Sequence, residues 1–353
     1  MKRNAIIAMS GGVDSSVAAY LVKEQGFGCV GVTMKLFSGE DAAHVDSCCS
    51  RDAGDAGSVA CRLGIPHHVF DFAGDFDKQV IRRFVEAYES GHTPNPCVDC
   101  NRYIKFGKLI PQAGLPECDF VATGHYARIE RERSGKFLLK KALDEAKDQS
   151  YFLYSMTQEQ LARTLFPLGG MKKKDVRKIA MARGFLNAAK RESQDVCFIT
   201  CGSYADFIER YRGKSCEPGD FVDPEGNVLG RHKGAIRYTL GQRRGLGISF
   251  RHRLYVCGKN MANNTVTLGN EELLYSKTLF AEKLNWISGT VPDRIRAEAK
   301  IGYRRAAFRV TAERVGDDRM RVEFDAPQKS AAAGQAVVLY DGFDVLGGGT
   351  ISV

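Results

Sequence analysis

One run of seven residues limits the fold more than any other feature of the chain: Ser10-Gly11-Gly12-Val13-Asp14-Ser15-Ser16. A short β-favouring segment, residues 4–9, precedes it, and residues 14–24 follow with apolar side chains at helical spacing. Glycines let the backbone turn tightly and point its N–H groups at an anion, and a helix start adds partial positive charge. The run therefore predicts a phosphate-binding turn, with a plain strand-to-helix turn as the alternative. It lacks the Gly-Lys-Ser ending of a Walker loop.

The next hundred residues alternate between strand and helix patterns. Strands are predicted at residues 29–36, 66–70 and 120–123, and helices at residues 52–63 and 75–89. Such alternation indicates a parallel sheet with crossover helices, which binds its ligand beyond the carboxyl ends of the strands. Both Ser10-Gly11-Gly12 and Gly124-His125 stand at such ends.

The sequence pattern changes after about residue 203. Short β-like runs alternate with Gly and Asn turns, and 353 residues is long for a single domain. We therefore expect an α/β domain with a parallel sheet at residues 1–203, a small linking domain at 204–275 and a C-terminal β-barrel at 276–353.

Charge and hydropathy point to a soluble protein with an anionic partner. The net charge is +9, and residues 226–270 contain eight Lys or Arg and no acid, while residues 172–191 contain eight more against one acid. One such stretch can be a solvated face, but two favour a polyphosphate partner such as nucleic acid. No apolar run is long enough to span a bilayer, so we expect a cytoplasmic protein without a membrane partner.

Three of the eleven cysteines have distinctive surroundings. Cys97 and Cys100 stand in a segment that Pro94 and Pro96 are expected to keep out of helix, and Cys197 follows after about 100 residues. Two thiolates three residues apart can share a metal, and with Cys197 they are one short of the ligand set of a [4Fe–4S] cluster. Zinc also suits such a site, and unrelated structural cysteines are the alternative.

The glycine run resembles the pyrophosphate loop (PP-loop) of the ATP pyrophosphatases, which split ATP between its α- and β-phosphates and adenylate an acceptor. The whole chain resembles the tRNA-specific 2-thiouridylase family, MnmA. The strings that carry this resemblance lie at residues 10–16, 93–106, 123–128, 147–154, 192–199, 238–248 and 334–337.

The resemblance implies a reaction and its partners. With ATP and Mg²⁺, such an enzyme adenylates the C2 oxygen of the wobble uridine in tRNA and replaces it with sulfur, releasing AMP and pyrophosphate. Its partners would be the anticodon region of tRNA and a sulfur donor, either a persulfide carrier protein or sulfide. The target base must leave its stack to be reached.

The resemblance also implies roles for individual residues. Cys100 corresponds to the nucleophile, and Cys197 to the cysteine that receives persulfide sulfur, a route that includes a disulfide bond. Asp14 is a candidate for Mg²⁺ or for capping the helix. The expected ATP site consists of Ala8, Met9, Ser10, Gly11, Gly12, Val13, Asp14, Ser15, Met34 and Gly124. The expected tRNA contacts, of which the first three line the target base, are Asn95, Pro96, Cys97, His125, Lys147, Asp148, Gln149, Tyr303, Arg304 and Gln335.

The chain departs from the family pattern at Cys97, where the common string has an aspartate that is a candidate acid or base. Asp99 is two residues away, about 6–7 Å along an extended chain. The three thiols at Cys97, Cys100 and Cys197 are instead compatible with a [4Fe–4S] cluster, and the persulfide route needs only the last two.

Two other functions are compatible with parts of the chain. An enzyme that adenylates a small molecule would need neither the cysteine segment nor the basic β region. A non-catalytic RNA-binding or iron–sulfur protein would not need the intact run from Ser10 to Ser16. Pyrophosphate release that depends on tRNA would separate all three.

Overall fold

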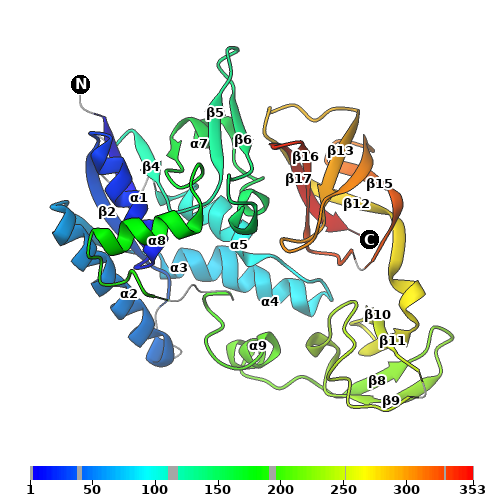
Figure 1. Cartoon of the computed structure of the whole chain (residues 1–353). Helices are drawn as coiled ribbons and strands as arrows, with labels where there is room; N and C mark the ends of the chain where they lie inside the picture. The colour runs from blue at the N-terminus through cyan, green and yellow to red at the C-terminus, as the bar shows by residue number, and fades with distance from the viewer. Residues whose placement is uncertain are drawn as a thin grey trace.

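The structure is a computed structural model that describes residues 3–37, 42–109, 118–190, 196–250, 252–329 and 331–352, with the backbone alone at 42–51. It has three parts: an N-terminal sheet covered by helices, a C-terminal barrel beside it, and a smaller β-rich domain below both in the view of Figure 1. This arrangement confirms the predicted fold class.

The N-terminal sheet is parallel, with strand order β3-β2-β1-β4-β7. Its strands are β1 (Asn4–Ala8), β2 (Gly28–Lys35), β3 (His67–Asp71), β4 (Phe120–Ala122) and β7 (Thr164–Leu165). Alternate residues of β1 point to opposite faces of the sheet. Ala5 and Ile7 pack with the helices α1 (Val13–Glu24), α2 (Ala42–Leu63) and α8 (Lys173–Ala182), whereas Ile6 and Ala8 pack with α4 (Arg82–Glu89).

The cysteine segment is helical, which corrects the prediction of an extended loop. It forms α5 (Pro96–Asp99) and continues as the π-helix η2 (Cys100–Lys105). Pro96 stands at the first helical position, where a missing N–H costs nothing because that group has no partner within the helix. The helix predicted at 75–89 is likewise divided into α3 (Ala73–Phe76), the π-helix η1 (Asp77–Ile81) and α4.

Shorter elements connect these parts. They are η3 (Glu145–Lys147), η4 (Ser150–Phe152), α7 (Gln158–Ala162), α9 (Tyr204–Arg212), η5 (Ala235–Arg237) and η6 (Glu271–Leu274). The middle domain contains a four-stranded sheet of order β10-β11-β8-β9. Its strands are β8 (Gly219–Val222), β9 (Val228–His232), β10 (Tyr255–Asn260) and β11 (Thr265–Gly269).

The C-terminal barrel has six antiparallel strands of order β12-β15-β14-β13-β16-β17, closed by pairing between β12 and β17. They are β12 (Tyr275–Trp286), β13 (Arg294–Lys300), β14 (Phe308–Arg314), β15 (Arg319–Lys329), β16 (Ala336–Asp341) and β17 (Asp344–Ser352). A hairpin from the N-terminal part, β5 (Arg128–Arg131) and β6 (Phe137–Lys140), pairs with β17. The barrel is therefore joined to the N-terminal domain through a shared sheet.

Among the described helices, none combines the length and the hydrophobicity that a membrane span requires.

Candidate active site

The phosphate loop lies between the carboxyl end of β1 and the start of α1. Its serine side chains form hydrogen bonds within the loop. The backbone N–H of Ser10 donates to Ser15 Oγ at 3.2 Å, and the hydroxyls of Ser15 and Ser16 donate to the Gly12 carbonyl at 3.0 and 2.9 Å. Gly11 has a φ of 69°, a conformation that favours glycine. The loop is thus held in a defined shape before any ligand arrives.

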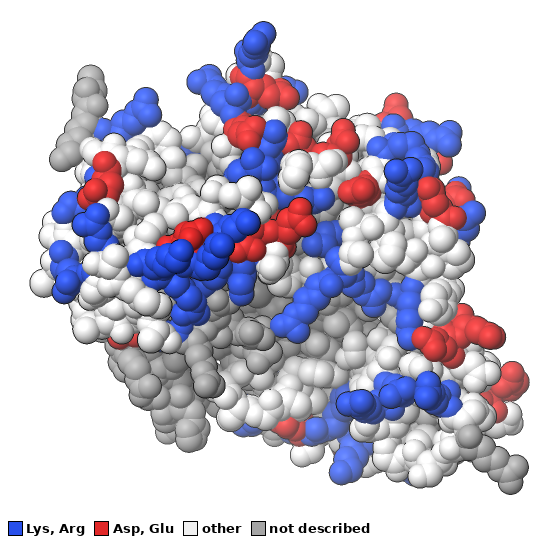
Figure 2. Space-filling model, viewed as in Figure 1, with Lys and Arg blue, Asp and Glu red and all other residues white. Residues whose placement is uncertain are grey.

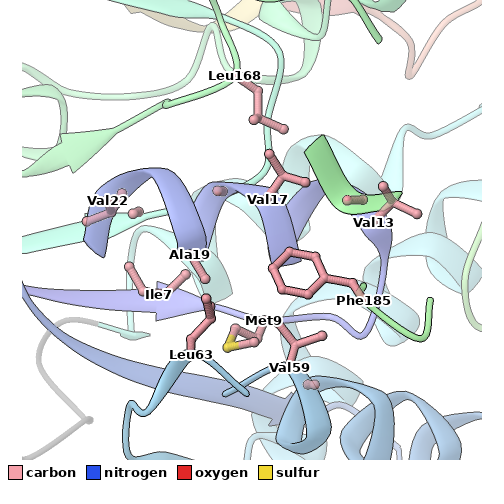
Figure 3. Close-up of a cluster of buried hydrophobic side chains, with 14 of the residues drawn as sticks. Ile7, Met9, Val13, Val17, Ala19, Val22, Val59, Leu63, Leu168 and Phe185 are labelled. Carbon is pink, nitrogen blue, oxygen red and sulfur yellow. The ribbon is translucent and has the colours of Figure 1, made fainter. Parts of the chain in front are cut away.

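An apolar cluster fixes the elements around the loop. Figure 3 shows Met9, at the end of β1, together with Val13 and Val17 of α1 and with Phe185, which follows α8. All four side chains are buried. Because close-packed side chains allow little movement, the cluster holds the start of α1 beside the segment around α8.

Gly124 brings the end of β4 against the same loop. A Cβ atom at Gly124 would lie 2.8 Å from the backbone of Asp14 and Ser15, closer than real contacts allow. The structure therefore places Gly124 and the phosphate loop at one edge of the sheet. Met34, at the end of β2, is partly buried and packs with the core on the opposite face.

Asp14 is engaged by two side chains that the sequence did not indicate. Lys173 Nζ lies 2.7 Å from both carboxylate oxygens of Asp14, and the Tyr126 hydroxyl donates to its Oδ1 at 2.8 Å. The capping role expected of Asp14 is wrong, since Asp14 lies inside the first turn of α1 and the N-cap residue is Gly12, which has no side-chain capping hydrogen bond. One signal for Lys173 was available: it shares the buried face of α8 with Val176 and Ala180.

A second lysine and an asparagine also contact the loop. Lys190 Nζ contacts Asp52 Oδ1 at 2.5 Å and Asp55 Oδ2 at 2.7 Å. Burial lowers the pKa of Lys190, but its hydrogen bonds to the two aspartates outweigh that effect, and the net shift is upward. The buried Asn187 donates its amide to the Gly11 carbonyl and to Ser16 Oγ, both at 2.9 Å. Sequence reasoning missed these residues.

The three predicted cysteines lie close enough to perturb one another electrostatically. Cys97 and Cys100 both raise the pKa of Cys197, although burial is the larger cause and brings it to about 12. Burial also raises the pKa of Cys97 and Cys100. Solvent reaches both Cys97 and Cys197. Beside Cys197, the buried Phe198 packs on Phe84 with ring centroids 5.1 Å apart, which anchors the segment.

The cysteines do not form the predicted metal-ligand set. No group of three His, Cys, Asp or Glu side chains within the described part of the chain is arranged to hold a metal ion. The nine cysteines that the structure describes are free thiols, so the expected disulfide is not formed among them.

The charge of Lys105 affects the pKa values of all three thiols. Its charge lowers their pKa values against the effect of burial. Lys105 Nζ also lies 3.5 Å from His125 Nε2, and His125 Nδ1 lies 2.7 Å from Thr123 Oγ1. Because an ammonium group can only donate, Nε2 is the acceptor and Nδ1 carries the proton. Burial, followed by the charge of Lys105, lowers the pKa of His125 well below its usual value, so its ring is neutral.

Asp99 stands next to Cys100 at the end of α5. Burial raises the pKa of Asp99 to about 6, with Arg83, Arg102 and Lys283 opposing the shift. The nitrogen Nε of Arg83 lies 3.8 Å from the Asp99 carboxylate. A carboxyl group that titrates near neutrality is thus present beside Cys100, two residues from the position where the family pattern has one.

Two of the residues expected to contact tRNA, Asp148 and Gln335, have hydrogen-bond partners within the protein. The buried Asp148 accepts hydrogen bonds from the backbone N–H groups of Ala142 and Ser150 at 3.0 and 3.2 Å, and from Ser150 Oγ at 2.8 Å. Gln335 donates its amide to the Thr93 carbonyl at 3.0 Å. Both side chains therefore hold the fold together around the cysteine segment and η3.

The other expected contacts differ in exposure. Gln149 Oε1 accepts from the Tyr126 backbone at 3.0 Å, which links the segment at 147–149 to the partner of Asp14. Tyr303 packs on Phe152 with ring centroids 4.5 Å apart, and Arg304 beside it is exposed. Lys147 is half-buried, and Asn95 and Pro96 begin α5 directly before Cys97.

Comparisons with known proteins identify the family. Models described as tRNA methyl transferase HUP domain, tRNA methyl transferase PRC-barrel domain and Aminomethyltransferase beta-barrel domain match residues 3–201, 205–270 and 276–351. The chain is 46% identical over 355 residues to "tRNA-specific 2-thiouridylase MnmA" of Clostridioides difficile, covering 99% of this chain and 98% of that protein. The protein of the same name from Geotalea uraniireducens is 48% identical, with coverage of 99% and 95%. The chain belongs to the MnmA family.

Among solved structures, the NMN synthetase from Francisella tularensis is similar at 16% identity and a TM-score of 0.35, covering 61% of this chain and 79% of that chain. That similarity is too low to bear on the site of this MnmA family member.

The basic stretches of this MnmA family member divide into two groups. Some cations are bound internally: Arg237 pairs with Asp206 at 2.9 Å and Glu209 at 2.6 Å, and Lys173 and Lys190 face the phosphate loop. Others, including Arg243 and Arg244, are exposed. Figure 2 shows lysine and arginine side chains on both sides of the hollow between the middle domain and the rest of the molecule.

Proposed function

We propose that this protein is a tRNA uridine 2-sulfurtransferase that uses ATP to convert the wobble uridine of tRNA to 2-thiouridine. One observation carries the proposal: the segment from Thr123 to His125 contacts the phosphate loop on one side and, through Lys105, lies next to the three cysteines on the other. Gly124 lies against Asp14 and Ser15, and His125 contacts Lys105, which acts on the three cysteines. A nucleotide site and a sulfur site so close together suit a reaction that activates a base and then thiolates it.

The first step is adenylation. The C2 oxygen of the uracil attacks the α-phosphorus of ATP, a new O–P bond forms, and the bond to the β-phosphate oxygen breaks with release of pyrophosphate. Backbone N–H groups of the phosphate loop and the start of α1 would hold the phosphates. Asp14 would hold Mg²⁺, which usually binds proteins through one or two carboxylates together with substrate phosphates and neutralises their charge.

The second step is sulfur transfer by the persulfide route. The terminal sulfur of a persulfide on Cys197 attacks C2, and the C2–O bond breaks with release of AMP. The Cys100 thiolate then attacks the Sγ atom of Cys197, which leaves the outer sulfur on the base with its electron pair. A disulfide between Cys100 and Cys197 results, and an external dithiol must reduce it. Lys105 stabilises the anionic sulfur in both attacks.

An iron–sulfur route is not part of this proposal, because the described cysteines do not form a metal-ligand set. We further propose that the functional domains span residues 1–203, 204–275 and 276–353, and that the protein works in the cytoplasm, where tRNA and ATP are available. The sulfur donor would be a persulfide carrier protein, since solvent reaches Cys197.

Methyl transfer is the second candidate, because two matching family models carry that description. It is disfavoured by the site itself. A methyltransferase needs neither three neighbouring thiols nor a preformed phosphate loop, whereas thiolation of an adenylated base uses both.

Nucleoside analysis of tRNA after reaction tests the proposal. Purified protein is incubated with tRNA, ATP, Mg²⁺ and a persulfide donor, and with S-adenosylmethionine in a parallel sample. We expect 2-thiouridine only with ATP, and pyrophosphate release that requires tRNA with uridine at the wobble position. A methylated base, or pyrophosphate release without tRNA, would overturn the proposal.

A further inference from the structure

Lys283 has a backbone conformation that lysine rarely adopts. Its φ is 54°, in the left-handed region that favours glycine because a Cβ atom there crowds the main chain. Lys283 lies in β12, where the pairing with β17 shifts by one residue between Glu282 and Asn285. A bulge of this kind directs a side chain away from the regular alternation of the strand. Because such strain is often kept at functional sites, the conformation points to a use for the lysine side chain.

Asp318 stabilises the bulge through the main chain. Its carboxylate oxygens accept hydrogen bonds from the backbone N–H groups of Lys283 at 3.2 Å and Leu284 at 2.8 Å. These bonds involve the backbone of Lys283, whereas its side chain is exposed. The barrel therefore presents this lysine at its surface from a fixed backbone conformation.

The charge of Lys283 acts on a residue beside the predicted cysteines. Together with Arg83 of α4 and Arg102 of η2, it lowers the pKa of Asp99 against the effect of burial. Asp99 directly precedes Cys100, and Arg83 Nε lies 3.8 Å from the Asp99 carboxylate. Three cations from two domains thus lie around the carboxylate next to Cys100.

The two arginines of this cluster are held against one aromatic ring. The guanidinium carbon of Arg83 lies 4.8 Å from the centre of the Tyr103 ring, and that of Arg102 lies 5.6 Å from it. Like charges brought together in this way repel each other. Because three cations face one carboxylate, the cluster keeps two excess positive charges even when Asp99 is ionised. Such a cluster attracts an anion from outside the protein.

We propose that Arg83, Arg102 and Lys283 bind one phosphate group of the tRNA backbone beside the target uridine. Guanidinium groups match phosphate oxygens with parallel N–H donors, and a lysine adds a point charge. The uridine must leave its stack to reach Cys100, so a phosphate that flanks it has to be held near the thiols. This inference rests on the proposed function, because it takes tRNA to be the substrate.

A phosphate of ATP has the same chemistry, but the position of the cluster favours tRNA. The phosphate loop lies at the start of α1, whereas the cluster lies on α4, η2 and the barrel. The Arg83 side chain is 38% exposed, and Lys283 is exposed as well, which suits a polymer that lies along the surface. Figure 2 shows lysine and arginine side chains where the N-terminal domain meets the barrel.

Binding of an anticodon stem-loop RNA that carries the wobble uridine tests the site without any turnover. Affinity is measured by fluorescence anisotropy at several salt concentrations for the wild type, Lys283→Gln, Lys283→Gly and Lys277→Gln. Lys277 is another exposed lysine of β12 and serves as the matched control. The RNA is used unmodified and with a neutral methylphosphonate in place of each phosphate that flanks the uridine, one position at a time.

Lys283→Gln should bind the unmodified RNA about tenfold more weakly, because one charged contact to phosphate is lost. Its plot of log affinity against log salt should be flatter by about 0.7, the contribution of one phosphate contact on a single strand. At one flanking position, the loss caused by methylphosphonate should be about tenfold larger in the wild type than in Lys283→Gln, because the lysine contact can be lost only once. Lys277→Gln should match the wild type.

Lys283→Gly separates the charge from the backbone conformation. Glycine adopts a φ of 54° without strain, so this variant should melt at the same temperature as the wild type or higher. Its RNA affinity should nevertheless fall as in Lys283→Gln. A lysine kept for structural reasons would give the reverse result, a lower melting temperature with unchanged RNA affinity.

Three results would overturn the inference. The first is a Lys283→Gln variant whose RNA affinity and salt dependence equal those of the wild type. The second is a loss caused by methylphosphonate that is the same in both proteins at every flanking position. The third is weaker binding of the α,β-methylene analogue of ATP by Lys283→Gln with normal RNA binding, which would assign the cluster to the nucleotide. A wild type that does not bind the RNA at all would count against the proposed function itself, and the inference would fall with it.

Discussion

The amide of Gln335 donates a hydrogen bond to the carbonyl of Thr93 at 3.0 Å, across 242 residues of sequence. Nearby, the Thr93 N–H donates to the Ala333 carbonyl at 2.8 Å. The loop before β16 of the barrel therefore holds the start of the cysteine segment. Through this contact the C-terminal domain positions the residues that are proposed to carry out sulfur transfer.

Gln335→Ala should therefore slow thiolation without weakening ATP binding. A misplacement of about 1 Å in reacting groups can cost about 100-fold in rate, so we expect a loss of about 10- to 100-fold. Single-turnover thiolation and nucleotide affinity are the measurements. Gln328→Ala is the control, because the Gln328 amide donates to the nearby Ala326 carbonyl at 2.9 Å. A normal rate in Gln335→Ala would mean that the Thr93 N–H bond alone suffices.

Arg243 and Arg244 should contribute to tRNA binding through phosphate contacts. Each phosphate contact steepens the dependence of log affinity on log salt by about 0.9 on a duplex, so replacing both with Gln should flatten the slope by about one to two units. Filter binding at several salt concentrations measures it. The exposed pair Arg131 and Arg133 in the β5–β6 hairpin provides a charge-matched comparison. An unchanged slope would assign the two arginines to another role.

The three cysteines should differ in importance. Cys100→Ser and Cys197→Ser should abolish thiolation, since each removes a sulfur that forms or breaks a bond. Cys97→Ser should keep activity within about threefold, because the persulfide route does not use it and an isosteric surface change costs little. Nucleoside analysis and the iron content of protein purified without air are measured together. If the wild type binds iron, and Cys97→Ser loses both the iron and the activity, the iron–sulfur route would be favoured over the persulfide route.

His125 should make stability depend on pH. Burial keeps its folded pKa well below the usual 6.5, so below about pH 6.5 the unfolded chain binds a proton that the folded chain does not. Stability should fall as the pH drops below that value, by about 1.4 kcal/mol per pH unit until the folded pKa is reached. Urea unfolding between pH 5 and 8, as an approximate working range, should show a smaller slope in His125→Gln than in His252→Gln, which replaces an exposed histidine.

We expect different roles for two neighbouring residues: Asp148 should stabilise the fold, and Lys147 should contact tRNA. Asp148→Ala leaves buried N–H groups without an acceptor and should cost about 2–4 kcal/mol of unfolding free energy. Lys147→Ala should leave stability nearly unchanged and weaken tRNA binding. Urea unfolding and tRNA affinity are measured for both variants. A stable Asp148→Ala protein with reduced tRNA affinity would return Asp148 to the tRNA contacts.

The sequence alone determined the features that depend on neighbouring residues. The turn from Ser10 to Ser16, the alternation of strands and helices and the β-rich C-terminal half follow from local backbone preferences and from periodic burial, which a single segment displays. Even there, Pro96 misled the prediction, because proline is excluded from helix interiors but accepted at the first helical position, where α5 has it.

Only the tertiary structure decided which distant side chains meet. Lys173 is one of three consecutive lysines and pairs with Asp14 across 159 residues, and the β5–β6 hairpin completes a sheet whose other strands begin at Tyr275. Charge and spacing give each lysine of that run the same appearance, since they do not show which helix face is buried or what lies opposite. Folding distinguishes Lys173 by burying it, and a buried ammonium group requires a counter-ion.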